Sequence, residues 1–174
     1  MKIGRVVISA EEIDAKLAEM GAQITEDYRD KDLLLVGILK GAFVVMADLA
    51  RHIDLPVEFD FMAVSSYGSA TKSSGVVRIL KDLDQEIDGR HVLIVEDIVD
   101  TGLTLHYLLK NLEVRKPASL SLAALLIKDG VDRPPLDVRY EGFHIPPAFV
   151  IGYGLDYDGK YRNLPYVAEV EELE

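Results

Sequence analysis

The chain has 174 residues, 49% of them apolar, which is enough for one domain with a proper hydrophobic core. Thirty acidic and 19 basic residues give a formal net charge of −11, which argues against general binding to nucleic acid or to anionic membranes. Without cysteine, disulfides, thiolate zinc sites and thiol nucleophiles are excluded. There is no run of 18 apolar residues and no apolar signal segment, so we expect a cytoplasmic protein.

The first part of the chain predicts an alternation of helices and strands. A capping box over 9–12 precedes apolar residues at helical spacing, which predict a helix over 10–25. A continuous apolar run over 32–39 is typical of a strand covered on both faces. Helical spacing follows over 42–53, and the alternation over 57–66 predicts a half-buried strand.

The second part repeats this order after a loop, expected over 65–75, that is rich in polar and small residues. In chain order we expect a short strand, a buried strand, a helix, a second buried strand and two short strands, at 76–80, 91–98, 102–112, 119–127, 138–140 and 149–153. The order predicts an α/β fold with a mainly parallel sheet.

Four polar segments follow predicted strands directly, at 39–41, 65–69, 96–102 and 127–130. In a parallel α/β sheet, ligands bind beyond the carboxyl ends of the strands. We therefore expect these four segments to meet in one binding site.

The segment VLIVEDIVDTGLT, residues 92–104, combines groups that bind a sugar phosphate. Residues 101–104 open a predicted helix, where free backbone N–H groups and two threonine hydroxyls suit a monophosphate. The adjacent carboxylates of Glu96 and Asp97 suit vicinal hydroxyls or hydrated Mg²⁺. The segment thus predicts a site for ribose 5-phosphate. In the alternative interpretation, Asp100 or Thr101 only caps the helix and the other acids are solvated.

VLIVEDIVDTGLT resembles the phosphoribosyl-diphosphate-binding motif of type I phosphoribosyltransferases. With ILKGAF, SSYGS, IKD and FVIGYGLDYDGKYRNLP, the chain is similar to the 6-oxopurine branch, the hypoxanthine-guanine phosphoribosyltransferases, from about residue 33 to 165. The resemblance implies an α/β, type I phosphoribosyltransferase fold with a mainly parallel twisted sheet flanked by helices. It implies one domain over 1–174, with a core over about 30–130 and a small hood from about 1–10 and 131–174.

The same resemblance implies an enzyme of purine salvage. It would transfer 5-phosphoribosyl from phosphoribosyl diphosphate to N9 of hypoxanthine or guanine, which gives IMP or GMP and pyrophosphate. Mg²⁺ is the implied cofactor. The implied partners are the two substrates, with no nucleic acid and no membrane, and the implied assembly is a homodimer or homotetramer.

Roles for the acidic loop follow from the resemblance. Glu96 and Asp97 face the ribose hydroxyls and, with Asp156, hold Mg²⁺. Asp100 is the general base, which takes the N7 proton of the purine as N9 attacks, and an ionised carboxylate suits that task. The 5-phosphate-binding loop consists of Asp100, Thr101, Gly102, Leu103 and Thr104.

Pyrophosphate is implied to bind Lys40, Gly41 and Arg162, with a cis peptide bond between Lys40 and Gly41. Ser66 and Tyr67 correspond to a mobile loop that closes over the reacting centre and excludes water. For Lys40 and Arg162 the alternative is a solvated surface charge.

The purine site is implied at the end of the buried strand 119–127 and in the C-terminal segment. Lys128 donates to the 6-oxo group, which disfavours adenine. Phe149 stacks on the purine, Val150 offers backbone hydrogen bonds, and Asp156 lies near the purine 2-position. The alternatives are a Lys128 side chain that extends to water and a Phe149 ring in the core.

Two stretches depart from the family pattern. Leu103 stands where some relatives have lysine, so one charged contact with phosphate is missing. The segment DGVDRPP after Lys128 differs from the basic continuation of many bacterial members, and Arg133 within it stays unassigned.

Three other classes fit the sequence less well. A receiver domain has a similar acidic strand near its start, but too few residues follow that strand here. An RNA-binding regulator with the same fold conflicts with the net charge of −11 and the lack of a basic stripe. A dinucleotide-binding dehydrogenase needs G-x-G-x-x-G, which the sequence lacks.

Overall fold

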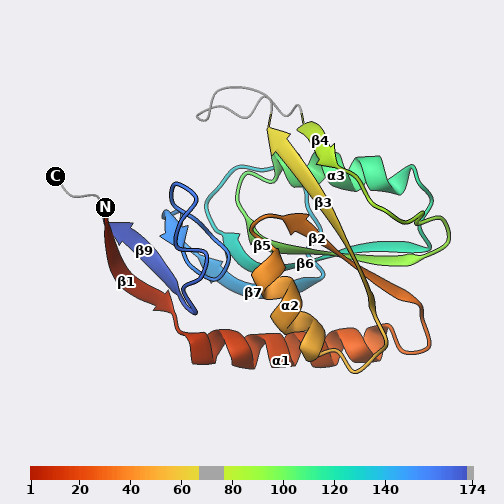
Figure 1. The fold of residues 1–174 in the computed structure, drawn as a ribbon, viewed down its shortest axis with the longest axis horizontal. Helices are drawn as coiled ribbons and strands as arrows, with labels where there is room; N and C mark the ends of the chain where they lie inside the picture. Colours follow the sequence, from red (N-terminus) through yellow and green to blue (C-terminus); the bar gives the residue numbers. More distant parts are fainter. Residues whose placement is uncertain (67–76, 172–174) are drawn as a thin grey trace.

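The computed structural model describes residues 1–66 and 77–171 (Figure 1). The helices in this part of the chain are α1 (Ala10–Asp27), α2 (Phe43–Arg51) and α3 (Leu103–Glu113). The strands are β1 (Lys2–Ile8), β2 (Leu33–Leu39), β3 (Glu58–Ser66), β4 (Val77–Lys81), β5 (His91–Val99), β6 (Ser119–Lys128), β7 (Tyr140–Ile145), β8 (Val150–Ile151) and β9 (Val167–Glu171). The predicted helices and the buried strands are thus confirmed to within a few residues.

The central sheet has the strand order β4-β3-β2-β5-β6-β7. All neighbouring pairs are parallel except β3 and β4, so the expectation of a mainly parallel sheet is confirmed. The strand order reverses between β2 and β5, because β3 follows on the outer side of β2 and β6 follows on the outer side of β5. The loops after β2 and β5 therefore flank the crevice at which α/β sheets bind ligands.

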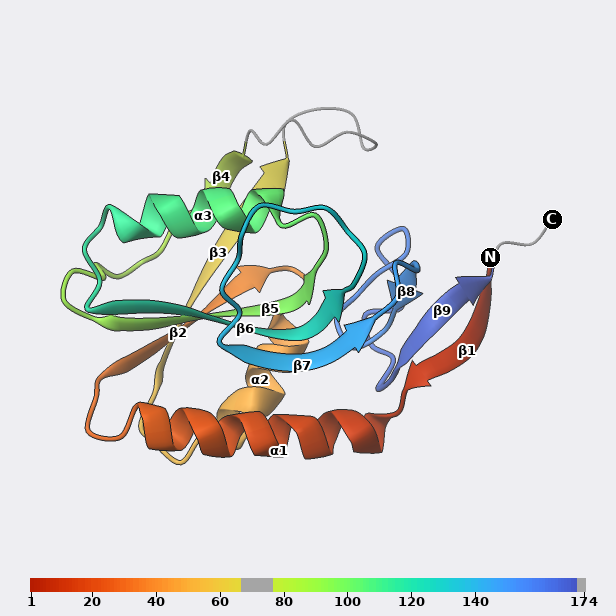
Figure 2. The same cartoon turned by 180° about the vertical axis from the view of Figure 1, so that it is seen from behind.

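Helices cover both faces of this sheet: α1 and α2 lie on one face and α3 on the other (Figures 1 and 2). Successive residues of a strand point to opposite faces. Leu35 and Leu93 accordingly pack in the core under α1 and α2, while Leu34 and Val92 pack in the core under α3. This double burial explains the unbroken apolar run of β2. Among the described residues, no helix is both long and apolar enough to span a membrane.

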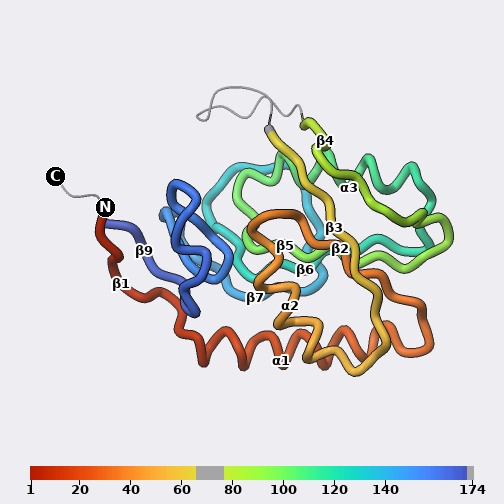
Figure 3. The backbone as a smooth tube through the Cα atoms, viewed as in Figure 1, coloured from red at the N-terminus to blue at the C-terminus, as the bar shows by residue number. Residues whose placement is uncertain are grey.

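A small antiparallel sheet, β1-β9-β8, lies at one end of the molecule. It joins the two ends of the chain, since Lys2 is paired with Glu171. The chain between β8 and β9 winds beside the carboxyl ends of the central strands (Figure 3). The sequence interpretation did not include β1 or β9 as strands.

The strand predicted at 138–140 is wrong except for its last residue. Val138 packs against the core under α3 and pairs with no strand, while β7 begins at Tyr140, whose hydroxyl donates to Asp27 of α1 at 2.7 Å. β7 completes the central sheet, which therefore extends beyond the boundary expected near residue 130. The predicted strand at 149–153 is shorter, because Gly152 has a φ of +95° and turns the chain.

Candidate active site

The acidic loop lies between β5 and α3 and forms a shallow pocket of about 160 Å³. Gly102 is the N-cap of α3, with a φ of +69°, and no side chain caps this helix end. The alternative that Asp100 or Thr101 is merely a cap is therefore wrong. The backbone N–H groups of the first turn stay available for an anion. The pocket is lined by Glu96, Ile98, Val99, Asp100, Thr101, Gly102, Thr104 and Leu105.

A second pocket, of about 230 Å³, adjoins the first and contains all four predicted purine-site residues. Its lining comprises Ile98, Asp100, Lys128, Phe149, Val150, Leu155 and Asp156. The two pockets share Ile98 and Asp100. Asp100 therefore lies at the junction of the candidate phosphate site and the candidate purine site. Ile98 and Leu155 were not predicted, because an apolar residue at a strand end has the same sequence signal whether it lines a pocket or the core.

Lys128 and Asp100 form an ion pair across this junction. The Nζ of Lys128 donates to Oδ2 of Asp100 at 2.9 Å, and the lysine side chain is only 14% exposed. The alternative in which Lys128 extends into water is therefore wrong. An ammonium group has three donors, so Lys128 can hold Asp100 and still donate to an oxygen in the pocket.

Phe149 is available as a stacking surface, since it is 55% exposed. The alternative that it is a core residue is therefore wrong. Tyr157 packs edge-on against it, with ring centroids 5.9 Å apart and planes at 87°. Such an edge-to-face partner fixes the orientation of a ring. Asp156 accepts a hydrogen bond from the backbone of Gly159 at 2.9 Å and pairs with Arg162 at 3.2 Å.

Glu96 and Asp97 lie within the protein at the end of β5, where burial disfavours their charged forms. Burial, followed by repulsion from Asp97, raises the pKa of Glu96 well above its ordinary value. Burial also raises the pKa of Asp97, although Arg162 and the N–H of Ile98 oppose that shift. Partly buried carboxylates of this kind suit a ligand that brings positive charge or hydroxyl donors.

The raised pKa of Glu96 predicts how stability depends on pH in the protein without Mg²⁺ or nucleotide. Between the ordinary pKa of 4.5 and the raised value, the folded state holds a proton that the unfolded chain has lost. The free energy of unfolding therefore contains a contribution that decreases as pH rises through this window. We expect Glu96→Gln to remove that contribution, so that the variant gains stability relative to the original protein as pH rises.

Urea unfolding between pH 4 and 8 measures this difference. Glu113→Gln, at an exposed position of α3, is the matched control and should leave the pH dependence unchanged. An identical pH dependence in Glu96→Gln and the original chain would contradict the prediction.

Gly41 and Gly154 bring the loop after β2 against both β5 and the C-terminal segment. A Cβ at Gly41 would lie 1.9 Å from Oδ2 of Asp97, and a Cβ at Gly154 would lie 2.1 Å from the carbonyl oxygen of Gly41. Arg162 joins the same cluster, because its Nη1 donates to the carbonyl of Gly154 at 2.6 Å. The alternative of a freely solvated Arg162 is therefore wrong, whereas the Lys40 side chain is exposed. Gly154 was not predicted.

The expected cis peptide bond between Lys40 and Gly41 is wrong by one position. The cis bond joins Leu39 to Lys40, at the end of β2. The resemblance indicated the loop, and the motif letters alone did not determine which of its bonds has the unusual geometry.

The described residues contain no group of three His, Asp or Glu side chains arranged to hold a metal ion. Glu96 and Asp97 are adjacent, while Asp156 is engaged with Arg162. Mg²⁺ is commonly held by one or two carboxylates together with substrate phosphates and not by a cage made of protein alone. The donor set fits that mode of binding. The assignment of Mg²⁺ to Glu96, Asp97 and Asp156 stays a prediction.

Ser66 ends β3, while Tyr67 and most of the predicted mobile loop lie outside the described residues.

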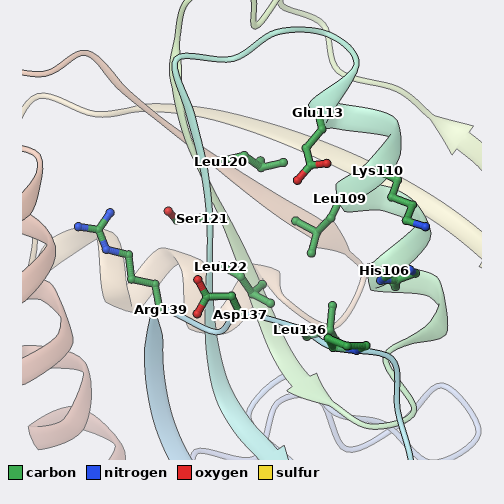
Figure 4. Close-up of a pocket in the computed structure, with 11 residues that line it drawn as sticks. His106, Leu109, Lys110, Glu113, Leu120, Ser121, Leu122, Leu136, Asp137 and Arg139 are labelled. Atoms are coloured by element: carbon green, nitrogen blue, oxygen red, sulfur yellow. The ribbon is translucent and has the colours of Figure 1, made fainter.

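A larger pocket, of about 330 Å³, lies between α3 and the connection from β6 to β7 (Figure 4). None of the predicted site residues lines it.

Comparison with known proteins identifies the family of this chain. Residues 9–158 match the family of the phosphoribosyl transferase domain. The hypoxanthine-guanine phosphoribosyltransferase of Mycobacterium avium is 55% identical, with 97% of this chain and 86% of the relative covered. That of Bacillus subtilis is 51% identical, with 95% and 92% covered. The crystal structure of a hypoxanthine phosphoribosyltransferase from Staphylococcus aureus has a TM-score of 0.94 at 44% identity, with 97% and 92% covered.

The fold and the site thus define a transferase of the phosphoribosyltransferase family, to which the chain belongs. Within the family its relatives are hypoxanthine-guanine phosphoribosyltransferases. Enzymes of this family generally use Mg²⁺ together with phosphoribosyl diphosphate.

Proposed function

We propose that this enzyme acts in purine salvage and transfers the 5-phosphoribosyl group of phosphoribosyl diphosphate to N9 of hypoxanthine or guanine. The products are IMP or GMP and pyrophosphate. The main support is the position of Asp100, which lines both the pocket of the acidic loop and the pocket of Lys128 and Phe149. A residue at that junction is within reach of both the sugar and the base.

The reaction breaks the bond from C1 of the ribose to the diphosphate oxygen and forms a bond from C1 to N9. The N7 proton of the purine moves to the carboxylate of Asp100, which Lys128 holds at 2.9 Å. General-base help of this kind contributes about 10²–10⁴-fold to the rate. The departing pyrophosphate is held by Lys40 and Gly41 of the loop after β2, which packs against Asp97, and by Arg162 of the C-terminal segment.

Glu96, Asp97 and Asp156 are the residues proposed to hold Mg²⁺ with the substrate. A bound Mg²⁺ would supply positive charge that offsets the negative charge of the diphosphate. Burial raises the pKa of both Glu96 and Asp97, and a bound cation would favour their ionised forms. Their carboxylates also accept hydrogen bonds from the ribose hydroxyls, and the N–H groups of residues 101–104 hold the 5-phosphate.

Lys128 is proposed to select the 6-oxo group, because an ammonium donates to an oxygen but has no acceptor for a 6-amino group. Replacing Lys128 with alanine is expected to lower the preference for hypoxanthine over adenine by at least about 10²-fold. The ratio of kcat/KM for the two bases measures this preference. Lys110→Ala, in the larger pocket of Figure 4, is the control and should keep the ratio. Retained preference in Lys128→Ala would show that the base is selected elsewhere.

The decisive test of the function is an assay with phosphoribosyl diphosphate, Mg²⁺ and a panel of bases. Formation of IMP and GMP from hypoxanthine and guanine is the expected result, and adenine should react poorly. Lack of product with every 6-oxopurine would refute the proposal.

The proposal takes residues 1–174 as one domain, with a core and a hood formed by the terminal segments. One buried cluster contains Ile8 and Val167 of the terminal segments together with Leu93 of the central sheet, which supports a single domain. We also propose a homodimer or homotetramer that works in the cytoplasm without nucleic acid or membrane as a partner. The net charge of −11 supports the exclusion of nucleic acid.

A further inference from the structure

The loop proposed to bind the 5-phosphate contains no positively charged side chain. Residues 100–104 are DTGLT, with one carboxylate, and Glu96 lines the same pocket. Lys128, which lies next to this loop, is engaged with Asp100. A phosphate beside these two acidic residues is repelled, when they are ionised, unless positive charge lies close to it.

Arg133 approaches this loop from the connection between β6 and β7. A Cβ at Gly102 would lie 3.8 Å from Cδ of Arg133 and 2.6 Å from Cδ1 of Leu136. The connection therefore packs directly on the phosphate loop, and Figure 4 shows Leu136 beside α3. The missing side chain of Gly102 leaves room for Leu136, and the stem of Arg133 lies in ordinary contact distance beside it.

The guanidinium of Arg133 has a hydrogen-bond partner for its Nη2 donor and none among the described residues for its Nε donor. Its Nη2 donates to the backbone carbonyl of Lys128. Its Nε is buried and has no hydrogen-bond partner among the described residues. A buried N–H of a charged group without an acceptor costs free energy. Such a donor beside a phosphate loop is suited to an anionic acceptor.

We propose that Arg133 is a substrate-positioning residue that supplies the positive charge of the 5-phosphate site. The inference rests on the proposed function. The bond to Lys128 fixes the guanidinium at the end of β6, and its charge stabilises the phosphate across Gly102. Because the carbonyl of Lys128 holds Arg133 and the ammonium of Lys128 holds Asp100, one strand end aligns the phosphate, the general base and the purine.

The test compares Arg133→Gln with Arg133→Lys. A hydrogen bond to a charged group contributes enough that Arg133→Gln should raise KM for phosphoribosyl diphosphate about 10- to 100-fold. KM for guanine should change by less than about 3-fold, a much smaller change than a factor of ten in affinity. Inhibition by GMP should weaken by about the same factor as the rise in KM for phosphoribosyl diphosphate. Inhibition by guanosine, which has no phosphate, should not change. Arg133→Lys keeps the charge and should retain most of the affinity.

Two further variants and a folding check separate this role from a purely structural one. Arg139→Gln changes an arginine of the same connection that pairs with Asp27, and it should leave KM for phosphoribosyl diphosphate unchanged. Adding Leu103→Lys to Arg133→Gln returns a positive charge to the loop and should restore part of the lost affinity. Thermal unfolding verifies that each variant is folded.

An unchanged KM for phosphoribosyl diphosphate in Arg133→Gln would overturn the proposal, as would equal weakening of GMP and guanosine. If the glutamine variant does not fold, Arg133→Lys decides, since a 10-fold rise in KM despite the retained charge also contradicts it. Failure of the proposed function itself gives a different result, because the original chain would then form no nucleotide.

Discussion

Asp100→Ala is expected to lower kcat at least about 100-fold, because it removes the carboxylate proposed to accept the N7 proton. Substrate binding should persist, since the backbone N–H groups of residues 101–104 and the purine pocket remain. In the original chain the Nζ of Lys128 donates to Asp100, so the substitution also leaves Lys128 without this partner. Single-turnover measurements of nucleotide formation separate the chemical step from binding.

Asp129→Ala provides the matched control, because Asp129 is a carboxylate next to Lys128 with a side chain that is 63% exposed. Its kcat should stay close to that of the original chain. Unchanged turnover in Asp100→Ala would remove this residue from the mechanism.

Gly41→Ala is the second change with a large expected effect. Its Cβ would lie 1.9 Å from Oδ2 of Asp97, so either the loop after β2 or the acidic strand end must shift. A displacement of about 1 Å at a catalytic site costs about 10²-fold in rate. We expect kcat/KM for phosphoribosyl diphosphate to fall by about that factor.

Gly89→Ala is the control for Gly41→Ala, because no atom lies within 4 Å of a Cβ at that position. Its φ of +72° predicts some loss of stability but unchanged activity. Thermal unfolding and steady-state kinetics on both variants test the pair. Normal kcat/KM in Gly41→Ala would show that the close approach to Asp97 is not needed.

The parts of the site that were predictable are those encoded by short contiguous segments. The loop of residues 100–104 follows a buried strand and precedes a helix. In a parallel sheet such a loop lies at the carboxyl ends of the strands, where ligands bind. Lys128 was predictable for the same reason. The resemblance then supplied Phe149, Val150 and Asp156, which the structure brings into one pocket with Asp100.

The features that the sequence did not reveal depend on contacts between distant segments. β1 and β9 become strands through each other, because Lys2 pairs with Glu171. The contact of Gly154 with Gly41 and the bond from Arg133 to the Lys128 carbonyl likewise arise only in the folded chain. Local spacing has no information about such partners. Val138 misled the interpretation because an apolar residue in a packed connection resembles one in a strand.

The small sheet has a consequence for synthesis on the ribosome. β1 is made long before β9, which is its only paired strand among the described residues, because Lys2 pairs with Glu171. At elongation rates of about 5–20 residues per second, β1 waits for roughly 8–30 s before its neighbour exists. β8, which includes Val150 of the candidate purine pocket, also pairs with β9. The candidate purine pocket is therefore expected to form on the nascent polypeptide only after Glu171 has been made, later than the central sheet.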